Sequence, residues 1–146
     1  MNHKLSKTIT SLFIVAIITG IGLVACNEKS VEGMLIVTKI STDSFNSADS
    51  TVIPNLPGAE LIAVSPKKAG ASEMQLTPDF YSACSPHLSY DAKRILFVGQ
   101  KNRNDSWQVW EMNLNNKSIR KLTDFKTSCY TPYYLPGEQF VFSKNS

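Results

Sequence analysis

Two stretches of this chain repeat each other 45 residues apart: Cys84-Ser-Pro-His-Leu-Ser-Tyr-Asp-Ala-Lys-Arg-Ile-Leu-Phe97 and Cys129-Tyr-Thr-Pro-Tyr-Tyr-Leu-Pro-Gly-Glu-Gln-Phe-Val-Phe142. Aligned without a gap, Cys84 falls on Cys129 and Phe97 falls on Phe142. A period of about 40–45 residues, made of several short strands, is typical of β-propellers. The repeat therefore predicts two neighbouring propeller blades.

The residues between the two copies also have the character of strands. Residues 95–98 form a continuous apolar run, which suits a strand covered on both faces. Residues 107–114 then place three apolar side chains on one face at a period of two: Trp110, Met112 and Leu114. Asn115-Asn116 is a turn pair that tolerates positive φ, and residues 118–123 form a short outer strand. We therefore predict an all-β fold of four-stranded antiparallel blades.

These segments resemble a known repeat family. Ser89-Tyr-Asp-Ala-Lys-Arg-Ile-Leu-Phe97 resembles the core of TolB-like β-propeller repeats, and Arg120-Lys-Leu-Thr123 is similar to the closing segment of such a repeat. The Cys-Ser-Pro opening and the Trp-Gln-x-x-Glu-Met-Asn run at residues 107–113 are also similar to the propeller of hydrazine synthase alpha subunits. The resemblance implies a propeller fold over residues 73–143. It does not imply one activity, because propellers host many functions.

The first 25 residues have the composition of a secretory signal. Lys4 and Lys7 precede an apolar segment from Leu12 to Val24, and Leu23-Val-Ala-Cys26 resembles the bacterial lipobox. That resemblance implies cleavage before Cys26 and lipidation of Cys26. Two or three acyl chains would anchor the protein stably in a membrane, whereas one chain binds only weakly and reversibly. The alternative is an uncleaved transmembrane helix, for which the apolar stretch is short.

The charge balance gives no support for nucleic-acid binding. The chain has 15 Lys and Arg against 12 Asp and Glu, and residues 1–25 contain two of the lysines and no acidic residue. The remainder is nearly neutral, whereas nucleic-acid binding needs a basic footprint.

We expect three segments: a lipoprotein signal peptide at 1–25 that forms a signal helix, a tether and irregular segment at 26–58, and TolB-like blades at 59–146. The last segment holds about two and a half blades, whereas a propeller needs at least four blades of about 40 residues. We therefore expect a truncated or split reading frame of a longer lipoprotein. Assembly with other copies and an unrelated small β-sandwich are the alternatives.

The cysteines allow two interpretations. With Cys26 lipidated, Cys84 and Cys129 remain as a pair in an oxidising compartment. They either form a disulfide between two blades or stay as two buried thiols. The sequence has no Cys-x-x-Cys and no Cys-x-x-Cys-His, so no zinc site, redox motif or haem attachment is predicted. His87 is the one histidine after the signal, which is weak support for a metal site or a catalytic base.

We predict no catalytic residue, metal or cofactor, because the motifs of nucleophile elbows, phosphate loops and zinc proteases do not occur. Five aromatic residues either line a carbohydrate- or peptide-binding face or pack the blades: Trp107, Trp110, Tyr130, Tyr133 and Tyr134. We expect a binding or scaffold module that is lipid-anchored at the bacterial cell envelope, on its periplasmic or outer-membrane side, with a protein or glycan partner. The alternatives are a fragment of a hydrazine-synthase-alpha-like enzyme subunit and a small autonomous β domain.

The lipobox generates the first testable prediction. Radiolabelled palmitate should be incorporated into the wild-type chain and not into the Cys26→Ser variant, because the thiol of Cys26 is the acylated group. Gel fluorography of cells that express each form measures the label. Equal labelling of both forms would contradict lipidation at Cys26.

Overall fold

The computed structural model describes residues 30–41, 56–67, 70 and 72–146. Within these residues every regular element is a strand, so the predicted all-β class is confirmed for this part of the chain. The predicted signal segment 1–25 and the proposed lipidation site Cys26 lie outside the described residues. No helix in the described part is long and apolar enough to cross a membrane.

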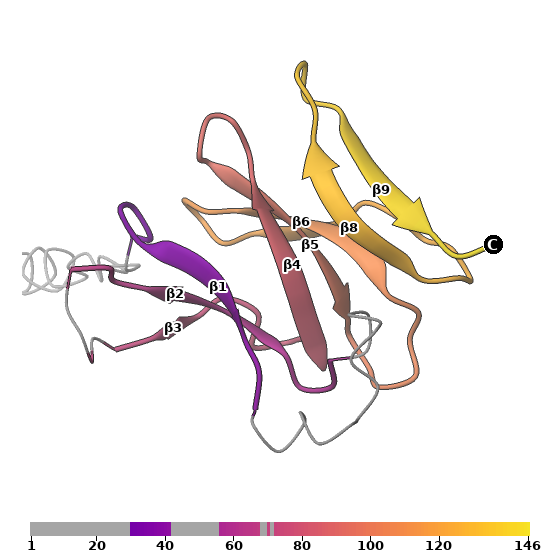
Figure 1. Ribbon diagram of the computed structural model, residues 1–146, viewed down its shortest axis with the longest axis horizontal. Helices are drawn as coiled ribbons and strands as arrows, with labels where there is room; N and C mark the ends of the chain where they lie inside the picture. The colour runs from indigo at the N-terminus through magenta and orange to yellow at the C-terminus, as the bar shows by residue number, and fades with distance from the viewer. Residues whose placement is uncertain (1–29, 42–55, 68–69, 71) are drawn as a thin grey trace, which may run out of the picture.

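The strands form three antiparallel sheets that follow one another as layers along the molecule (Figure 1). The first sheet has the order β1 (Leu35–Lys39), β2 (Glu60–Val64) and β3 (Met74–Gln75). The second sheet contains β4 (Ser82–Leu88), β5 (Arg94–Gln100), β6 (Gln108–Asn113) and β7 (Ile119–Lys121), in that order. The third sheet consists of β8 (Cys129–Tyr134) and β9 (Phe140–Lys144).

The second sheet is the four-stranded unit that the sequence predicts, and the third sheet pairs two strands as β4 pairs with β5. β1 lies within the predicted tether segment 26–58, yet it pairs with β2 over its whole length. The first sheet thus draws on residues from both sides of the predicted boundary at residue 59. The described residues do not form a closed ring of sheets.

Strand β5 is covered on both faces, as its continuous apolar run predicts. Ile95 and Phe97 belong to the core between the first and second sheets. Leu96 and Val98 belong to the core between the second and third sheets. All four side chains are at most 2 % exposed. A strand with alternate residues in two different cores needs no polar face, which explains why the sequence shows no alternation there.

The two copies of the repeat differ in length by one residue, so the alignment without a gap is wrong in their first strands. Cys84 pairs with Val98 in the second sheet, but Tyr130, not Cys129, pairs with the corresponding Ser143 in the third. The first strands of these sheets are therefore 46 residues apart, and the second strands 45. The difference arises in the turn between them. The turn closed by the Ser89 N–H and the Arg94 carbonyl is one residue longer than the turn from Leu135 to Gln139.

Both first strands carry the same β-bulge. Ser85-Pro86 in β4 and Thr131-Pro132 in β8 occupy the shift in register, and φ is 56° at Ser85 and 46° at Thr131. A non-glycine residue with positive φ is uncommon, and bulges bend and twist the strand that contains them. The two Ser/Thr-Pro pairs, 46 residues apart, are thus the part of the sequence that marks the true register.

The same hydrogen bonds join each sheet to the next. The N–H of Ala83 donates to the carbonyl of Ala59, and the N–H of Cys129 donates to the carbonyl of Trp107, both at 2.8 Å. A serine supports each joint, because the hydroxyl oxygen of Ser82 accepts from the N–H of Ala59 (3.2 Å). Ser128 does the same for Trp107, at 3.1 Å.

The Leu-Thr pairs that follow the last strands of the first and second sheets have a defined role. The N–H of Leu122 donates to the carbonyl of Val109 (2.8 Å), and the hydroxyl oxygen of Thr123 accepts from the N–H of Val109 (2.9 Å). Leu76 and Thr77 make the corresponding bonds to Leu61, at 2.8 and 3.1 Å. Thr77 and Thr123 are both buried. Each threonine therefore satisfies a backbone donor of β2 or β6, just beyond the end of the neighbouring short strand, β3 or β7.

One turn differs from its prediction. The positive φ in the hairpin between β6 and β7 lies at Lys117 (54°), and not at Asn115 or Asn116. The Asn113 side-chain oxygen accepts from the N–H of Asn115 at 2.9 Å and from that of Asn116 at 3.4 Å. These side-chain bonds hold the turn, so a simple two-residue hairpin is not required.

The Leu-Thr closure yields a prediction on stability. Thr123→Val keeps the shape of the side chain but leaves the buried N–H of Val109 without its acceptor, so the free energy of unfolding should fall by about 1–3 kcal/mol. Thr127→Val is the control, because the contacts of Thr127 in this region use its backbone carbonyl, and it should change stability by less than about 0.5 kcal/mol. Urea unfolding followed by circular dichroism measures both. Equal losses would contradict the assigned role.

Candidate functional site

A buried carboxylate lies between the second and third sheets. Glu111 of β6 is only 6 % exposed. It accepts a hydrogen bond from the hydroxyl of Tyr134 (2.8 Å) and pairs with Arg120 through Nε and Nη2, both at 2.6 Å. Nη1 of Arg94 lies 3.7 Å from Oε1 of Glu111, the oxygen that also accepts from Tyr134. The strands β5, β6, β7 and β8 therefore each contribute one member of this polar joint.

Arg94 extends the joint to the solvent. Its Nη2 lies 3.1 Å from Glu138, a residue in the turn between β8 and β9, and its guanidinium carbon lies 5.9 Å from the centre of the Tyr134 ring. Burial raises the pKa of the Tyr134 phenol, and the neighbouring Glu111 carboxylate, which accepts a hydrogen bond from the phenol, raises that pKa further. Tyr134 therefore remains a protonated donor at neutral pH.

The geometry of this joint suits a structural role. Both oxygens of Glu111 already have a donor, so neither is free to take a proton from a substrate. An ionised group that is buried and saturated with hydrogen bonds fixes the relative position of the elements that supply its partners. In the described part of the chain, moreover, no group of three His, Cys, Asp or Glu residues is placed to hold a metal ion.

His87 also contributes to the contact between the second and third sheets. Its Nδ1 accepts a hydrogen bond from the backbone N–H of Tyr134 (3.2 Å), and its ring meets the ring of Tyr133 edge-on at 4.9 Å. An Nδ1 that accepts leaves the proton of the neutral ring on Nε2. The histidine is thus used in packing one sheet on the next.

The two cysteines lie in one apolar cluster. Cys84 and Cys129 are both buried free thiols within the core between the second and third sheets. Burial raises the pKa of the Cys84 thiol, which makes it a poor nucleophile at neutral pH. The gap in the repeat means that Ala83, not Cys84, occupies the place equivalent to Cys129. A disulfide between the two in the exported protein stays a prediction.

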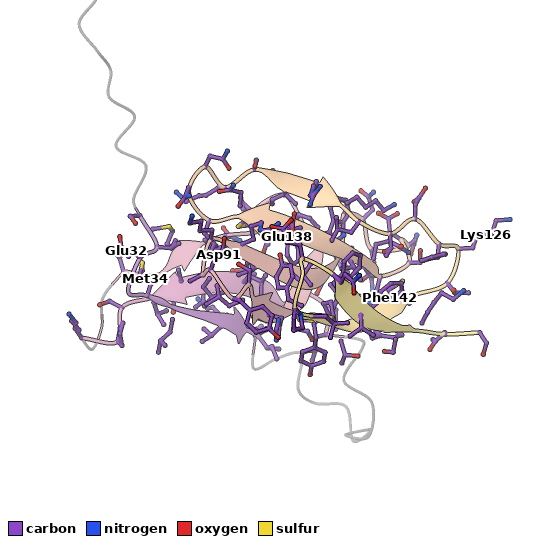
Figure 2. The ribbon with its side chains drawn as sticks, turned by 90° about the horizontal axis from the view of Figure 1, so that it is seen from above. Glu32, Met34, Asp91, Lys126, Glu138 and Phe142 are labelled. Carbon is purple, nitrogen blue, oxygen red and sulfur yellow. The ribbon has the colours of Figure 1, made fainter. Side chains whose placement is uncertain are left out.

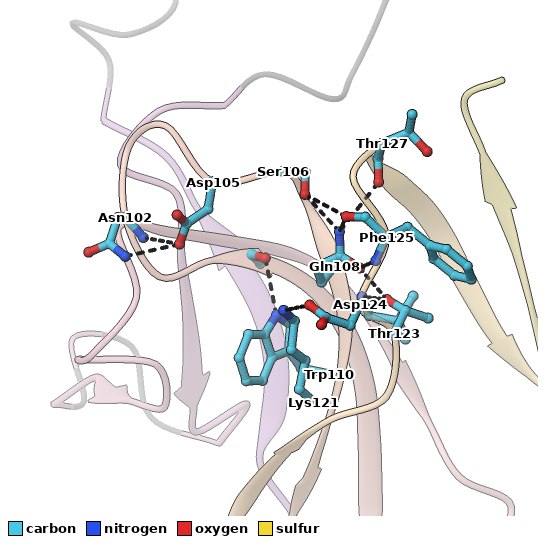
Figure 3. Close-up of polar contacts among 12 residues, drawn as sticks. Asn102, Asp105, Ser106, Gln108, Trp110, Lys121, Thr123, Asp124, Phe125 and Thr127 are labelled. Atoms are coloured by element: carbon cyan, nitrogen blue, oxygen red, sulfur yellow. Dashed lines mark hydrogen bonds and ion pairs between the residues drawn. The ribbon is translucent and has the colours of Figure 1, made fainter.

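Gln108 forms a second polar cluster that the sequence did not single out (Figure 3). Its side-chain nitrogen donates to Ser106 and to the carbonyls of Phe125 and Thr127, at 2.9, 2.9 and 3.3 Å. Its side-chain oxygen accepts from the hydroxyl of Thr123 (2.8 Å) and from the N–H of Phe125 (3.0 Å). The side chain is buried and ties the connection between the second and third sheets to β6. In the sequence, Gln108 is marked only by its place in a predicted strand. A place in a strand does not by itself predict that a glutamine side chain is buried.

The aromatic residues mostly pack the sheets. Trp107 and Tyr134 are at most 5 % exposed, and Trp110 and Tyr130 are half-buried against the two cores. The indole N–H of Trp110 donates to the carbonyl of Gly99 (3.1 Å). Tyr133 alone of the five is largely exposed, at 51 %. The packing interpretation therefore holds for four of the five aromatics.

Comparisons with known proteins agree with the architecture. No protein-family model matches the sequence. The chain is 38 % identical, over 63 residues, to hydrazine synthase subunit alpha of Kuenenia stuttgartiensis. This match covers 42 % of the chain and 8 % of that subunit.

A solved structure of Kuenenia stuttgartiensis hydrazine synthase superposes with a TM-score of 0.60 at 20 % identity. The superposition covers 78 % of the chain and 16 % of the solved one. The chain is therefore similar in sequence to a small part of the alpha subunit and shares the fold of a part of the solved enzyme.

The polar joint generates a prediction on stability. Glu111→Gln should lower the free energy of unfolding by about 3 kcal/mol, because breaking a buried ion pair leaves buried groups without a charged partner. Glu138→Gln is the matched control. It removes the exposed carboxylate partner of Arg94, which also lies near Glu111, and should cost less than about 1 kcal/mol. Urea unfolding at low and high salt measures both. The same loss in the two variants would mean that Glu111 does not hold the sheets together.

Proposed function

We propose that this chain is a segment of a β-propeller that acts as a binding or scaffold module at the bacterial cell envelope, with the lipid on Cys26 as its anchor. The observation that carries the proposal is the exposure of apolar side chains on the outer faces of the two end sheets. Leu35 and Val37 are 53 and 37 % exposed on β1, and Tyr133 and Val141 are 51 and 47 % exposed on the third sheet.

These residues follow the alternation of the strands. In β1, Ile36 packs into the core toward the second sheet, so Leu35 and Val37 point the other way. In β9, Phe140 and Phe142 pack into the core toward the second sheet, so Val141 points outward.

Tyr133 is opposite Val141 in the ladder, and its ring, although 51 % exposed, also meets His87 of β4. Apolar side chains exposed on the outer face of a sheet favour an interaction site there. In a repeat architecture such a face is the place where the next unit stacks.

The envelope location rests on the lipobox-like sequence Leu23-Val-Ala-Cys26. A protein or glycan is a more suitable partner than a nucleic acid, because the chain without residues 1–25 is nearly neutral. The polar side chains at the sheet contacts, Glu111 and Gln108 among them, are engaged with other protein groups. This favours binding over catalysis as the role of the segment.

A second candidate is a part of an enzyme subunit related to hydrazine synthase subunit alpha. The 38 % identity over 63 residues favours it. Hydrazine formation by a complex that co-purifies with the tagged full chain from its own cells would support this candidate. A complex without that activity, in which the chain still binds its partner, would support the scaffold.

The proposal predicts self-association when the end faces have no partner. Residues 27–146 expressed alone should be β-rich, unfold over a broad range and elute as oligomers. Val37→Lys together with Val141→Lys should shift the elution toward the monomer, because each lysine places a charge in an apolar contact. Size-exclusion chromatography with light scattering measures the mass.

Tyr90→Lys is the control, because Tyr90 is 76 % exposed but lies in the turn between β4 and β5, away from both faces. It should leave the oligomers unchanged. A wild-type segment that is a uniform monomer with a sharp, cooperative unfolding transition would contradict the proposal and favour a small autonomous β domain.

A further inference from the structure

A groove of about 550 Å³ lies where the first sheet meets the second. Its walls come from the first two residues of β1 with the residues just before them, and from β4 with the turn that follows it. The start of β5 and the residues just after β6 close it. Among the lining residues, Leu88 is 48 % exposed. Glu32, Met34 and Asp91 also line it, and Figure 2 shows these three side chains gathered at one end of the molecule.

The repeat shows which element of a sheet belongs at this place. β1 pairs with β2 as β5 pairs with β6, and the Thr77 and Thr123 bonds identify β2 and β6 as equivalent third strands. β1 is therefore the second strand of its sheet, equivalent to β5 and β9. On their other edge, β5 carries β4 and β9 carries β8. In the described part of the first sheet, β1 has no such neighbour, and the groove adjoins it.

The two first strands in the structure show what this edge accepts. Both β4 and β8 are extended, antiparallel to the second strand, and bulged at a Ser/Thr-Pro pair. Both also place a buried residue against the preceding sheet: Ala83 in β4 and Cys129 in β8. An occupant of the groove would gain main-chain hydrogen bonds from β1 and apolar contacts from Leu88 and Met34.

We propose that this groove binds an extended peptide segment of a partner, which adds to β1 as an antiparallel strand. The segment has the chemistry of β4: small or apolar residues at alternate positions and a Ser/Thr-Pro pair. The inference rests on the proposed role as a binding module, and it names the kind of partner. Main-chain bonds to the open edge supply affinity, and the apolar lining beside Leu88 and Met34 selects the side chains.

A labelled synthetic peptide tests this groove. The probe is the sequence of residues 80–90 of this chain with Cys84 replaced by serine, and a scrambled peptide of the same composition is its control. The full chain in detergent micelles should bind the probe saturably in fluorescence anisotropy and should not bind the scrambled peptide. No difference between the two peptides would overturn the proposal.

Two variants locate the binding. Leu88→Lys should weaken binding by about tenfold, which corresponds to the loss of one buried leucine contact. Leu135→Lys is the matched control and should bind as the wild type does, because Leu135 is an exposed leucine just beyond β8 that does not line the groove. Equal weakening in both variants would overturn the proposal.

Hydrogen exchange gives a readout that does not depend on the variants. Addition of the probe should slow exchange in residues 35–39 of β1 and leave residues 140–144 of β9 unchanged. Protection of β9 instead would place the peptide on the third sheet and overturn the groove assignment. If the probe does not bind while the Val37 and Val141 lysine variants still abolish association, the groove inference fails and the proposed module stands.

Discussion

The structure depends on a backbone joint between the third strand of one sheet and the first strand of the next. The carbonyls of Ala59 and Trp107 accept from the N–H groups of the following first strands, and a serine hydroxyl accepts from the N–H of each of the two residues. Ala59 and Trp107 are both buried, so these backbone groups must be satisfied inside the protein. The joint therefore fixes where each new sheet begins, and with it the two apolar faces between which β5 is packed.

The sequence predicted the strands well because their signals are local. The apolar run of β5 and the alternation of β6 are each contained in fewer than ten residues, and both are confirmed. The register of the repeat was predicted with an error because the match of Cys84 with Cys129 outweighed the Ser/Thr-Pro pairs. Register is set by ladder pairing and turn length, and a difference of one residue in a turn has no signal in the strands themselves.

The candidate site was much less accessible to prediction than the fold. Glu111 and Gln108 belong to the run whose likeness to hydrazine synthase alpha subunits is visible in sequence. Apart from Ser106, which is two positions from Gln108, their partners come from residues 9 to 23 positions away, and nothing in the run itself specifies them. In the structure Trp107 and Met112 fill the two cores, while Asn113 holds a turn. The likeness in this run thus reflects the packing of a sheet, which proteins of different functions share.

The two end faces are of opposite kinds. Val37 on the outer face of the first sheet takes the place that Phe97 has in β5, on the side that meets a preceding sheet. Val141 on the outer face of the third sheet takes the place of Leu96, on the side that meets a following sheet. A sheet that covers one end by the same packing makes the contact with the opposite kind of face and leaves exposed the same kind of face that it covered, so the series has a direction. A directional series closes only when the rotation from sheet to sheet completes a ring. The packing that buries both faces of the second sheet thus leaves apolar side chains exposed on the outer faces of the first and third sheets.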